Sequence, residues 1–388
     1  MTTTTLEKPI TIKHELNTAE IPGIIEKQYE YFYSGATRSY DFRIEQLKRL
    51  KQMIKENEEL IEDALKADLN KPKFEAYASE IGFMYEEINF TIEKLHKWMR
   101  PEKVDTPLIH QPSSSRIISE PLGVVLIIGA WNYPFQLTIS PLVGAIAAGN
   151  CSLVKPSELA PRTSDVVAEL VAKYFDPEYV AAVPGGVEVS QALLEHRYDH
   201  IFFTGSTQVG RIIAQAAAKH LTPTTLELGG KSPCIVDEKT DIKISARRIA
   251  WGKYFNAGQT CVAPDYLLLP ASRKDEFIKY FKESVREFYG EDPSTSPDYC
   301  RIVSRRHYDR LAKFLNDGEV VLGGRVDADQ LYIEPTLLDG VSPDAPIMQE
   351  EIFGPILPII EYDDLDDAVR KVRSRPTPLA RWLRRCGW

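Results

Sequence analysis

The amino-acid sequence predicts an α/β protein in which two successive regions each form a largely parallel sheet covered by helices. The segment Leu122–Gly129 is a continuous apolar run, which is typical of a strand buried on both faces. Strand-like and helix-like patterns then alternate at the spacing of a doubly wound sheet. Beyond Gly230 the same alternation starts again. The length of 388 residues is enough for two or three domains.

Two helices are expected before the first apolar strand. Apolar side chains at helical spacing predict one helix over 41–68 and another over 74–95, separated by a break at Pro72. We expect both helices to cover a sheet and their charged residues to form solvated faces. The Pro- and Ser-rich segment 101–115 predicts an excursion from the domain body, with a strand at 116–119.

The remaining elements follow from short apolar runs and amphipathic stretches. In the first region we expect strands at 122–129, 152–154, 180–183, 200–203 and 225–228, and helices at 137–148, 162–174, 188–194 and 208–219. In the second we expect strands at 234–236, 266–269, 332–333 and 356–360, and helices at 241–256, 273–289 and 305–316. The segment 373–388 follows neither pattern, and we expect no regular structure there.

Composition narrows the class of protein. A hydrophobic content of 43% and a net charge of −9 fit a soluble globular protein and argue against nucleic acid as a partner. The most apolar window, 122–149, is interrupted by Pro134 and Pro141, so a strand, turn and helix explain it better than a membrane span. The first ten residues, Met1–Ile10, lack the pattern of a signal peptide.

The five cysteines are odd in number and widely spread, and they show no metal-binding spacing. We therefore expect no disulfide framework and no metal site, and a reducing cytoplasm as the location. Cys261 stands apart from the other four. A helical pattern ends at Gly258 and Pro264 prevents another helix from starting, so Cys261 is expected on a short bend facing a cleft. A thiol there can act as a nucleophile, although a lone cysteine is also a common small core residue.

A glycine-rich turn predicts a possible phosphate site. It begins at Gly205 after a predicted strand and ends at Gly210 inside a predicted helix. Ser206 or Thr207 can cap that helix, and the free N–H groups beyond attract phosphate. Gln208 and Val209 complete the segment between the glycines, which is not the GxGxxG fingerprint; a turn without a ligand has the same pattern.

Four further polar residues follow predicted strands, where ligands bind in α/β folds. Glu227 could act as a general base if partly buried, or could pair with a lysine. Asn132 could donate a hydrogen bond to an oxyanion, or could cap the next helix. Lys155 and Glu158 could hold ribose hydroxyls or phosphate, or could be surface charges.

Taken in order, these motifs resemble the aldehyde dehydrogenase superfamily. The motifs that carry the resemblance are Trp131-Asn-Tyr-Pro-Phe, Lys155-Pro-Ser-Glu, Gly205-Ser-Thr-Gln-Val-Gly, Glu227-Leu-Gly-Gly-Lys, Gly258-Gln-Thr-Cys and Glu350-Glu-Ile-Phe-Gly-Pro. The resemblance extends from about residue 20 to about residue 370. It is strongest to the shorter branch, which handles fatty and aromatic aldehydes and is often dimeric.

The resemblance implies a role for each of the three catalytic candidates. Cys261 would attack the aldehyde carbon, and the Asn132 amide and the Cys261 backbone N–H would hold the oxyanion. Glu227 would activate the water that releases the acid. The implied reaction is NAD(P)-dependent oxidation of an aldehyde, medium- or long-chain aliphatic or aromatic, to the carboxylic acid through a thiohemiacetal and a thioester.

The resemblance also implies a site for NAD or NADP and leaves the choice between them open. Lys155 and Glu158 would contact the adenosine ribose, and Gly205–Gly210 would hold the pyrophosphate. Glu351 and Phe353 would position the nicotinamide ribose and ring. Two alternatives to acid production remain: CoA-dependent release of the thioester, which a base at Glu227 argues against, and a cofactor-binding remnant without turnover.

The implied organisation is a dinucleotide-binding domain over 1–107 and 121–229, a protruding oligomerisation segment over 108–120, a catalytic domain over 230–362 and an atypical tail over 363–388. A homodimer is expected for the family. From Arg381 the chain departs from the family pattern, which continues with a strand and a Gly-rich turn. We therefore expect a weakened substrate enclosure and dimer interface, and low activity.

Overall fold

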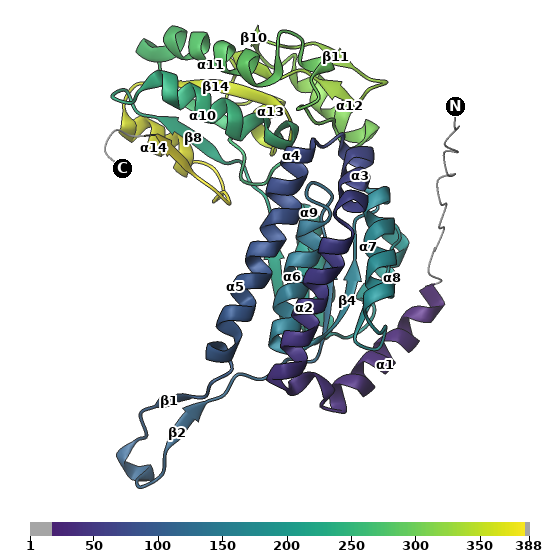
Figure 1. Ribbon diagram of the computed structural model, residues 1–388. Coiled ribbons are helices and arrows are strands. Elements are labelled where there is room, and N and C mark those ends of the chain that lie inside the picture. The colour runs from purple at the N-terminus through teal and green to yellow at the C-terminus, as the bar shows by residue number, and fades with distance from the viewer. Residues whose placement is uncertain (1–17, 385–388) are drawn as a thin grey trace, which may run out of the picture.

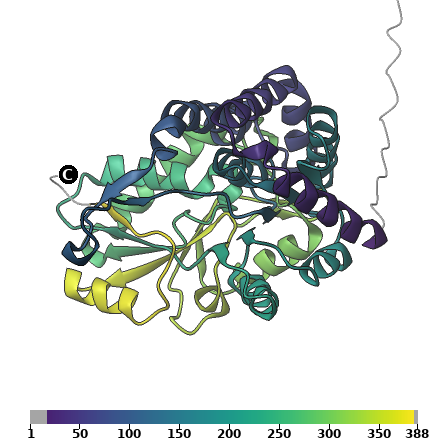
Figure 2. The same ribbon diagram turned by 90° about the horizontal axis from the view of Figure 1, so that it is seen from below.

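A computed structural model describes residues 18–384, and Figure 1 shows two lobes with a long two-stranded hairpin extending from the lower one. The expectations for Met1–Ile10 and for Cys386 lie outside the described residues. So do the start of the predicted first domain, residues 1–17, and the end of the predicted tail, residues 385–388. In the view of Figure 2 the purple N-terminal helices and the yellow helix α14 (Leu365–Arg373) lie on opposite sides of the molecule.

The N-terminal helices are shorter and more numerous than predicted. They are α1 (Ile21–Tyr33), α2 (Tyr40–Glu56), α3 (Glu58–Leu69), α4 (Lys73–Ala76) and α5 (Gly82–Trp98), with a π-helical turn at Tyr77–Ile81. The single helix predicted over 41–68 is wrong because Asn57 ends α2: its backbone is non-helical, and its Nδ2 donates to the carbonyl of Met53 at 2.7 Å. The break at Pro72 is confirmed.

The lower lobe contains the doubly wound parallel sheet that the sequence predicts. Its strands are β3 (Val124–Ile128), β4 (Cys151–Lys155), β5 (Val180–Ala182), β6 (His200–Thr204) and β7 (Thr224–Glu227), in the order β5-β4-β3-β6-β7. All neighbouring pairs are parallel. The helices between them are α6 (Gln136–Ala148), α7 (Pro161–Tyr174), α8 (Val187–Leu194) and α9 (Thr207–Lys219).

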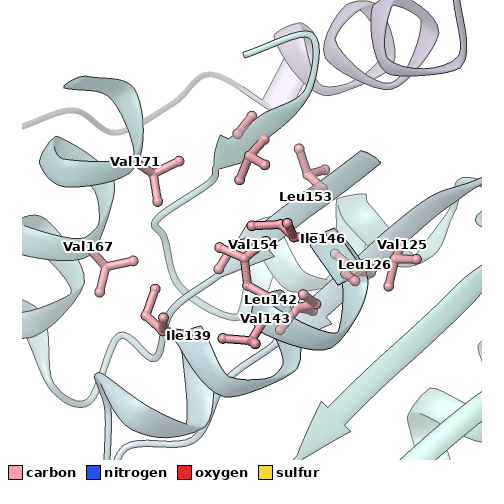
Figure 3. Packing of buried hydrophobic residues seen from close by; sticks show 14 of the residues in the cluster. Val125, Leu126, Ile139, Leu142, Val143, Ile146, Leu153, Val154, Val167 and Val171 are labelled. Carbon is pink, nitrogen blue, oxygen red and sulfur yellow. The ribbon is translucent and has the colours of Figure 1, made fainter. Parts of the chain in front are cut away.

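The core of this lobe lies between the sheet and helices α6 and α7. All five residues of β3 and all five of β4 are buried, which is why their sequences lack strand alternation. Figure 3 shows Leu126 of β3 and Val154 of β4 close to Leu142 of α6, and the same buried cluster includes Val171 of α7. This packing fixes the carboxyl ends of β3 and β4, where the functional residues begin.

The upper lobe contains a mixed sheet in the order β10-β13-β14-β9-β8-β15. Its strands are β8 (Pro233–Val236), β9 (Tyr266–Pro270), β10 (Glu319–Leu322), β13 (Thr336–Asp339), β14 (Ile356–Tyr362) and β15 (Trp382–Arg384), of which only β10 runs antiparallel to its neighbour. The helices are α10 (Ile242–Tyr254), α11 (Lys274–Tyr289), α12 (Arg305–Phe314), α13 (Pro346–Gln349) and α14.

Three sequence expectations for the upper lobe are corrected. The strand predicted at 332–333 is β12 (Tyr332–Ile333), which pairs with β11 (Val326–Asp327) outside the main sheet. Strands β10 and β13 were not predicted. The expectation of no regular structure over 373–388 is wrong for β15, which pairs in parallel with β8. A strand that pairs with an open sheet edge through its backbone does not need alternating side chains. A strand of three residues therefore leaves little pattern in the sequence.

The predicted excursion is the hairpin of β1 (Glu102–Val104) and β2 (Ser115–Ile117), so the strand expected at 116–119 begins one residue earlier. Two side chains at its tip, Leu108 and Ile109, are 89% and 86% exposed. Within residues 18–384, no helix is long and apolar enough to cross a membrane.

Truncating the core of the lower lobe is expected to destabilise the whole protein. Leu153 has no exposed surface, so Leu153→Ala should lower the free energy of unfolding by about 2–5 kcal/mol, measured by urea denaturation. Leu221→Ala is the control, because Leu221 is 91% exposed and should change stability by less than about 0.5 kcal/mol. Equal effects of the two substitutions would contradict the assignment of the core.

Candidate active site

The strand order creates a switch point between β3 and β6. Strands β4 and β5 extend the sheet on one side of β3, whereas β6 and β7 extend it on the other. Ligands of such sheets bind beyond the carboxyl ends of the strands at this point. Asn132 follows β3 and Gly205 follows β6, while Lys155 and Glu227 are the last residues of β4 and β7. Four of the sequence-predicted residues therefore share one edge of the sheet.

Cys261 follows an unusual turn in the upper lobe. Asn256, Ala257 and Gly258 have φ values of 54°, 51° and 73°, which are three consecutive left-handed residues. This conformation is rare for Ala, and at Gly258 a Cβ would lie 2.3 Å from the carbonyl oxygen of Gly354. A second turn then follows, closed by the hydrogen bond from the N–H of Ala263 to the carbonyl of Thr260 at 3.0 Å. Cys261 lies inside this second turn.

Buried hydrogen bonds hold the left-handed turn in place. The backbone N–H of Asn256 donates to Glu75 Oε2 at 2.9 Å, and its Nδ2 donates to the carbonyl oxygen of Asn132 at 2.8 Å. Gln259 completes the frame: its Nε2 donates to the carbonyl of Asn256 at 3.1 Å and its Oε1 accepts from the N–H of Val303 at 3.0 Å. The nucleophile loop is thus tied to the N-terminal helices and to the segment after β3.

A buried ion pair supports the same junction. Lys71 and Glu80 form an ion pair in which neither side chain has exposed surface. Lys71 Nζ also donates to the carbonyl of Asn132 at 3.1 Å, and Glu80 Oε2 accepts from the N–H of Phe135 at 2.9 Å. The expectation that the charges near these helices form solvated faces is therefore wrong for Lys71, Glu75 and Glu80.

Sequence reasoning missed these three residues as parts of the site. In the sequence, Lys71 stands beside the helix break at Pro72, and Glu75 and Glu80 are two of several charged residues in the helix that follows. No periodicity separates a carboxylate that faces water from one whose partner lies far along the chain. The one available signal is that a lysine and two acidic residues lie close in sequence to the helix break at Pro72.

The segment Asn132–Tyr133 lies directly against the nucleophile loop. Tyr133 and Thr260 share a hydrogen bond between their hydroxyl oxygens at 2.6 Å. Asn132 is only 3% exposed and does not cap α6, whose N-cap position is Phe135 and whose first N–H groups are bound by Glu80. The capping alternative for Asn132 is therefore wrong.

The environment of Cys261 differs from that of the other described cysteines. Cys151, Cys234 and Cys300 are buried, whereas Cys261 is partly exposed and lies outside the hydrophobic core. Partial burial raises the pKa of its thiol, as do the nearby carboxylates of Glu351 and Glu227. The N–H groups of Cys261 itself and of Val262 point at the sulfur and lower this pKa. These donors could equally stabilise negative charge on a reacting atom.

The two carboxylates facing Cys261 have different surroundings. Burial raises the pKa of Glu351 to about 7, and the Gly230 N–H opposes the shift. The Glu351 carboxyl packs directly on Gly229, because a Cβ there would lie 2.2 Å from Glu351 Oε2. Glu227 is exposed, so the partial burial expected for it is wrong. It forms no ion pair with any residue in 18–384, so its pairing with a lysine is not found either. Its carboxylate is therefore open to water.

The predicted cofactor residues of α9 lie at the same edge of the sheet. Ser206 caps α9 by accepting from the N–H of Val209 at 3.3 Å, and Thr207 and Gln208 form the first turn of that helix. A Cβ at Gly210 would lie 2.7 Å from Leu228 Cδ2, so this helix packs closely on the strand end. The exposed start of a 13-residue helix is suited to a phosphate group.

Two other elements complete this part of the crevice. Lys155 is 2% exposed and pairs with Glu158, so Lys155 is not a surface charge. Phe353 has a left-handed backbone with φ of 54°, and its ring lies 5.2 Å from that of Trp131. The ring of Trp131 also lies 4.8 Å from that of His307, whose pKa burial lowers to about 4.

Comparisons with known proteins identify the family of the chain. The model of the Aldehyde dehydrogenase family matches residues 4–381. The chain belongs to the aldehyde dehydrogenase family. It is 50% identical over 366 residues to 4,4'-diaponeurosporen-aldehyde dehydrogenase of Staphylococcus aureus, covering 93% of this chain and 80% of that protein. It is 47% identical to the mouse aldehyde dehydrogenase described as dimeric and NADP-preferring, covering 94% of this chain and 81% of the relative.

Solved structures of aldehyde dehydrogenases have the same fold as this chain. The substrate-bound Staphylococcus aureus AldH superposes with a TM-score of 0.93 at 48% identity, covering 95% of this chain and 81% of that one. The Mycobacterium tuberculosis aldehyde dehydrogenase in complex with NAD+ gives a TM-score of 0.86 at 29% identity, covering 95% and 78%. This aldehyde dehydrogenase therefore oxidises an aldehyde with NAD or NADP. The alternative of a remnant without turnover is not favoured.

The buried carboxyl of Glu75 predicts a pH-dependent stability. Burial raises its pKa to about 7, so between pH 4.5 and 7 the folded chain keeps a proton that the unfolded chain releases, and stability falls as pH rises. Glu75→Gln should remove this loss. The free energy of unfolding of the variant relative to wild type should rise by about 2–3 kcal/mol from pH 5 to pH 8.

Urea denaturation at the two pH values measures this difference. Glu59→Gln on α3, at an exposed position, is the control and should follow wild type at both pH values. A Glu75→Gln variant whose stability also remains parallel to wild type would contradict the assignment.

Proposed function

We propose that this crevice oxidises medium- to long-chain aliphatic or aromatic aldehydes with Cys261 as the nucleophile. The observation that carries the proposal is the setting of its sulfur: partly exposed, faced by two backbone N–H groups and near the carboxylates of Glu227 and Glu351. The other described cysteines, Cys151, Cys234 and Cys300, are buried and lack this exposure.

The first step is attack on the carbonyl carbon. The thiol proton passes to water, a bond forms between sulfur and carbon, and the electron pair of the C=O π bond moves to the carbonyl oxygen, which takes the negative charge. The Cys261 N–H and the side-chain amide of Asn132 are the proposed donors to that oxygen. Removing one such donor typically costs 10²–10³ in rate. The backbone of Asn132 is held by Lys71 and Asn256, which keeps this residue beside the loop.

NAD or NADP, when bound, supplies the acceptor for the hydride that leaves the same carbon. Ser206 and the first turn of α9 (Thr207–Gly210) would hold the pyrophosphate, and Lys155 and Glu158 the adenosine ribose. Glu351 and Phe353 would position the nicotinamide ribose and ring. The start of α9 fits this assignment, because residues 206–209 are exposed and N–H groups at a helix start attract phosphate.

The last step is hydrolysis of the thioester on Cys261. Glu227 takes a proton from water, the resulting hydroxide attacks the acyl carbon, and the bond between carbon and sulfur breaks to release the acid and the thiol. The exposed Glu227 carboxylate, at the end of β7, has access to that water. A base in this position favours hydrolysis over transfer to CoA, which needs no activated water.

Exposed apolar side chains near the loop support an apolar substrate. Trp251 is 52% exposed and Val262 is 41% exposed, and the ring of Phe255 lies 5.3 Å from that of Trp251. Relatives carry names that fit this class, among them the diaponeurosporen-aldehyde dehydrogenase. The names also include an NADP-preferring dimer, and a solved relative contains NAD+, so both cofactors belong in the assay.

We further propose a homodimer in a reducing cytoplasm. Leu108 and Ile109 at the hairpin tip, with Ile117 and Ile118 at its base, are more than half exposed, as residues of a subunit interface would be in one isolated protomer. The proposed domains are those expected from the sequence, with two separate hydrophobic cores in their support. Free cysteines fit a reducing compartment.

Replacing the proposed base should separate the two halves of the reaction. Glu227→Gln with hexanal and NAD or NADP should release one hydride per subunit and then stall, with steady-state turnover at least about 100-fold lower. Reduced cofactor is followed by absorbance in a stopped-flow instrument. Cys261→Ala should show neither burst nor turnover. Sustained turnover by Glu227→Gln would exclude it as the base, and turnover by Cys261→Ala would exclude the nucleophile.

The hairpin predicts the oligomeric state. The double variant Leu108→Asp, Ile109→Asp should convert the dimer to a monomer, because two buried charges would oppose the interface. Light scattering after gel filtration measures the mass. Leu221→Asp, at another exposed leucine, should remain dimeric. A monomeric wild type, or a dimeric double variant, would contradict the proposal.

A further inference from the structure

The strand β15 and the residues just before it touch two turns of the proposed site: the turn after Glu227 and the turn that contains Cys261. In the turn after β7, a Cβ at Gly230 would lie 3.0 Å from the Cα of Pro378, so the chain passes directly over that turn. Four residues further along, the indole Nε1 of Trp382 donates to the carbonyl oxygen of Val262 at 2.7 Å. Val262 is the residue after Cys261.

The position of Trp382 is set by the sheet and not by the loop that it contacts. β15 pairs in parallel with β8, with Trp382 opposite Cys234 and Leu383 opposite Ile235. The N–H of Ala380 also donates to Ser232 Oγ at 3.4 Å. The strand therefore provides a fixed support beside a loop whose preceding turn is left-handed.

The indole is oriented by its packing as well as by its hydrogen bond. A Cβ at Gly252 on α10 would lie 3.7 Å from Trp382 Cη2 and 4.0 Å from Pro264 Cδ. The ring thus lies where α10 and the segment after Cys261 come together, and it packs against the core of the upper lobe. A ring held in this way directs its N–H toward one acceptor.

We propose that Trp382 is a positioning residue for the nucleophile: its indole N–H holds Val262 so that the loop presents Cys261 to the crevice. The inference rests on the proposed role of Cys261. Its physical basis is that the N–H of Val262 points at the sulfur while its carbonyl is bound to Trp382. The N–H and the carbonyl belong to the two peptide groups on either side of the Val262 Cα, so holding the carbonyl restricts the backbone rotations at Val262 that would turn the N–H away from the sulfur.

The expected consequence is a change in thiol reactivity when the indole N–H is removed. Trp382→Phe keeps an aromatic ring and loses the donor. Val262 is then free to turn, and its N–H stabilises the thiolate less. The groups that oppose the charge, Glu351 and Glu227, are unchanged and still face the sulfur. The thiol should therefore ionise at higher pH and react more slowly.

The experiment measures alkylation of Cys261 by iodoacetamide across pH 6–10, with the modified peptide quantified by mass spectrometry. Trp382→Phe should react about threefold to tenfold more slowly at pH 7.5, as expected for one lost hydrogen bond, with its pH profile displaced upward. Its kcat with hexanal should fall by a similar factor at unchanged KM for the cofactor. Leu383→Ala, on the same strand and 56% exposed, is the matched control and should behave as wild type.

A wild-type rate and pH profile in Trp382→Phe would overturn the inference, as would the same change in Leu383→Ala. A measurement on the unaltered protein guards against a variant that does not fold. The indole N–H of Trp382 should exchange with solvent slowly by NMR, and rapid exchange would also overturn the inference. Cys261→Ala separates the two proposals: if it retains turnover, the proposed function fails, whereas a dead Cys261→Ala with an unaffected Trp382→Phe rejects only the role of Trp382.

Discussion

The active-site geometry depends on the left-handed turn Asn256–Gly258. Such a backbone costs about 1–3 kcal/mol at each non-glycine residue, so it persists only where surrounding contacts enforce it. Here two of the contacts come from the lower lobe: Glu75 accepts the N–H of Asn256, and the carbonyl of Asn132 accepts its side chain. The same hydrogen bonds join the nucleophile loop to the sheet that ends in the proposed cofactor site. The same hydrogen bonds therefore hold the two lobes together and fix the loop that carries Cys261.

The surroundings of the sulfur raise the pKa of the Cys261 thiol on balance, so they do not activate it at rest. Burial and the carboxylates of Glu351 and Glu227 favour the neutral thiol, whereas the N–H groups of Cys261 and Val262 favour charge. The same N–H groups are suited to a developing oxyanion, so a contribution that is small for the resting thiol becomes larger in the transition state. Burial raises the pKa of Glu351 to about 7, so near neutral pH the carboxyl of this residue beside the thiol is partly protonated.

The elements that the sequence predicted correctly are those with strong local signals. The buried strands of the lower lobe, the cap at Ser206 and the bend at Cys261 each follow from a few neighbouring residues. The missed features depend on distant partners: the bond between Asn256 and Glu75 spans 181 residues, and the strand β15 is visible only once β8 offers an open edge. The break at Asn57 was missed because the apolar spacing continues across it. Residues such as Glu75 look solvated until the fold supplies their partners.

The central claim is that the acyl group is carried on one sulfur atom. The most direct measurement mixes the enzyme with hexanal and cofactor, quenches it in acid within milliseconds and maps the modified peptide by mass spectrometry. The account predicts a hexanoyl adduct on the peptide containing Cys261, appearing with the first reduced cofactor. Reduced cofactor formed without that adduct, or with the acyl group on another residue, would contradict it.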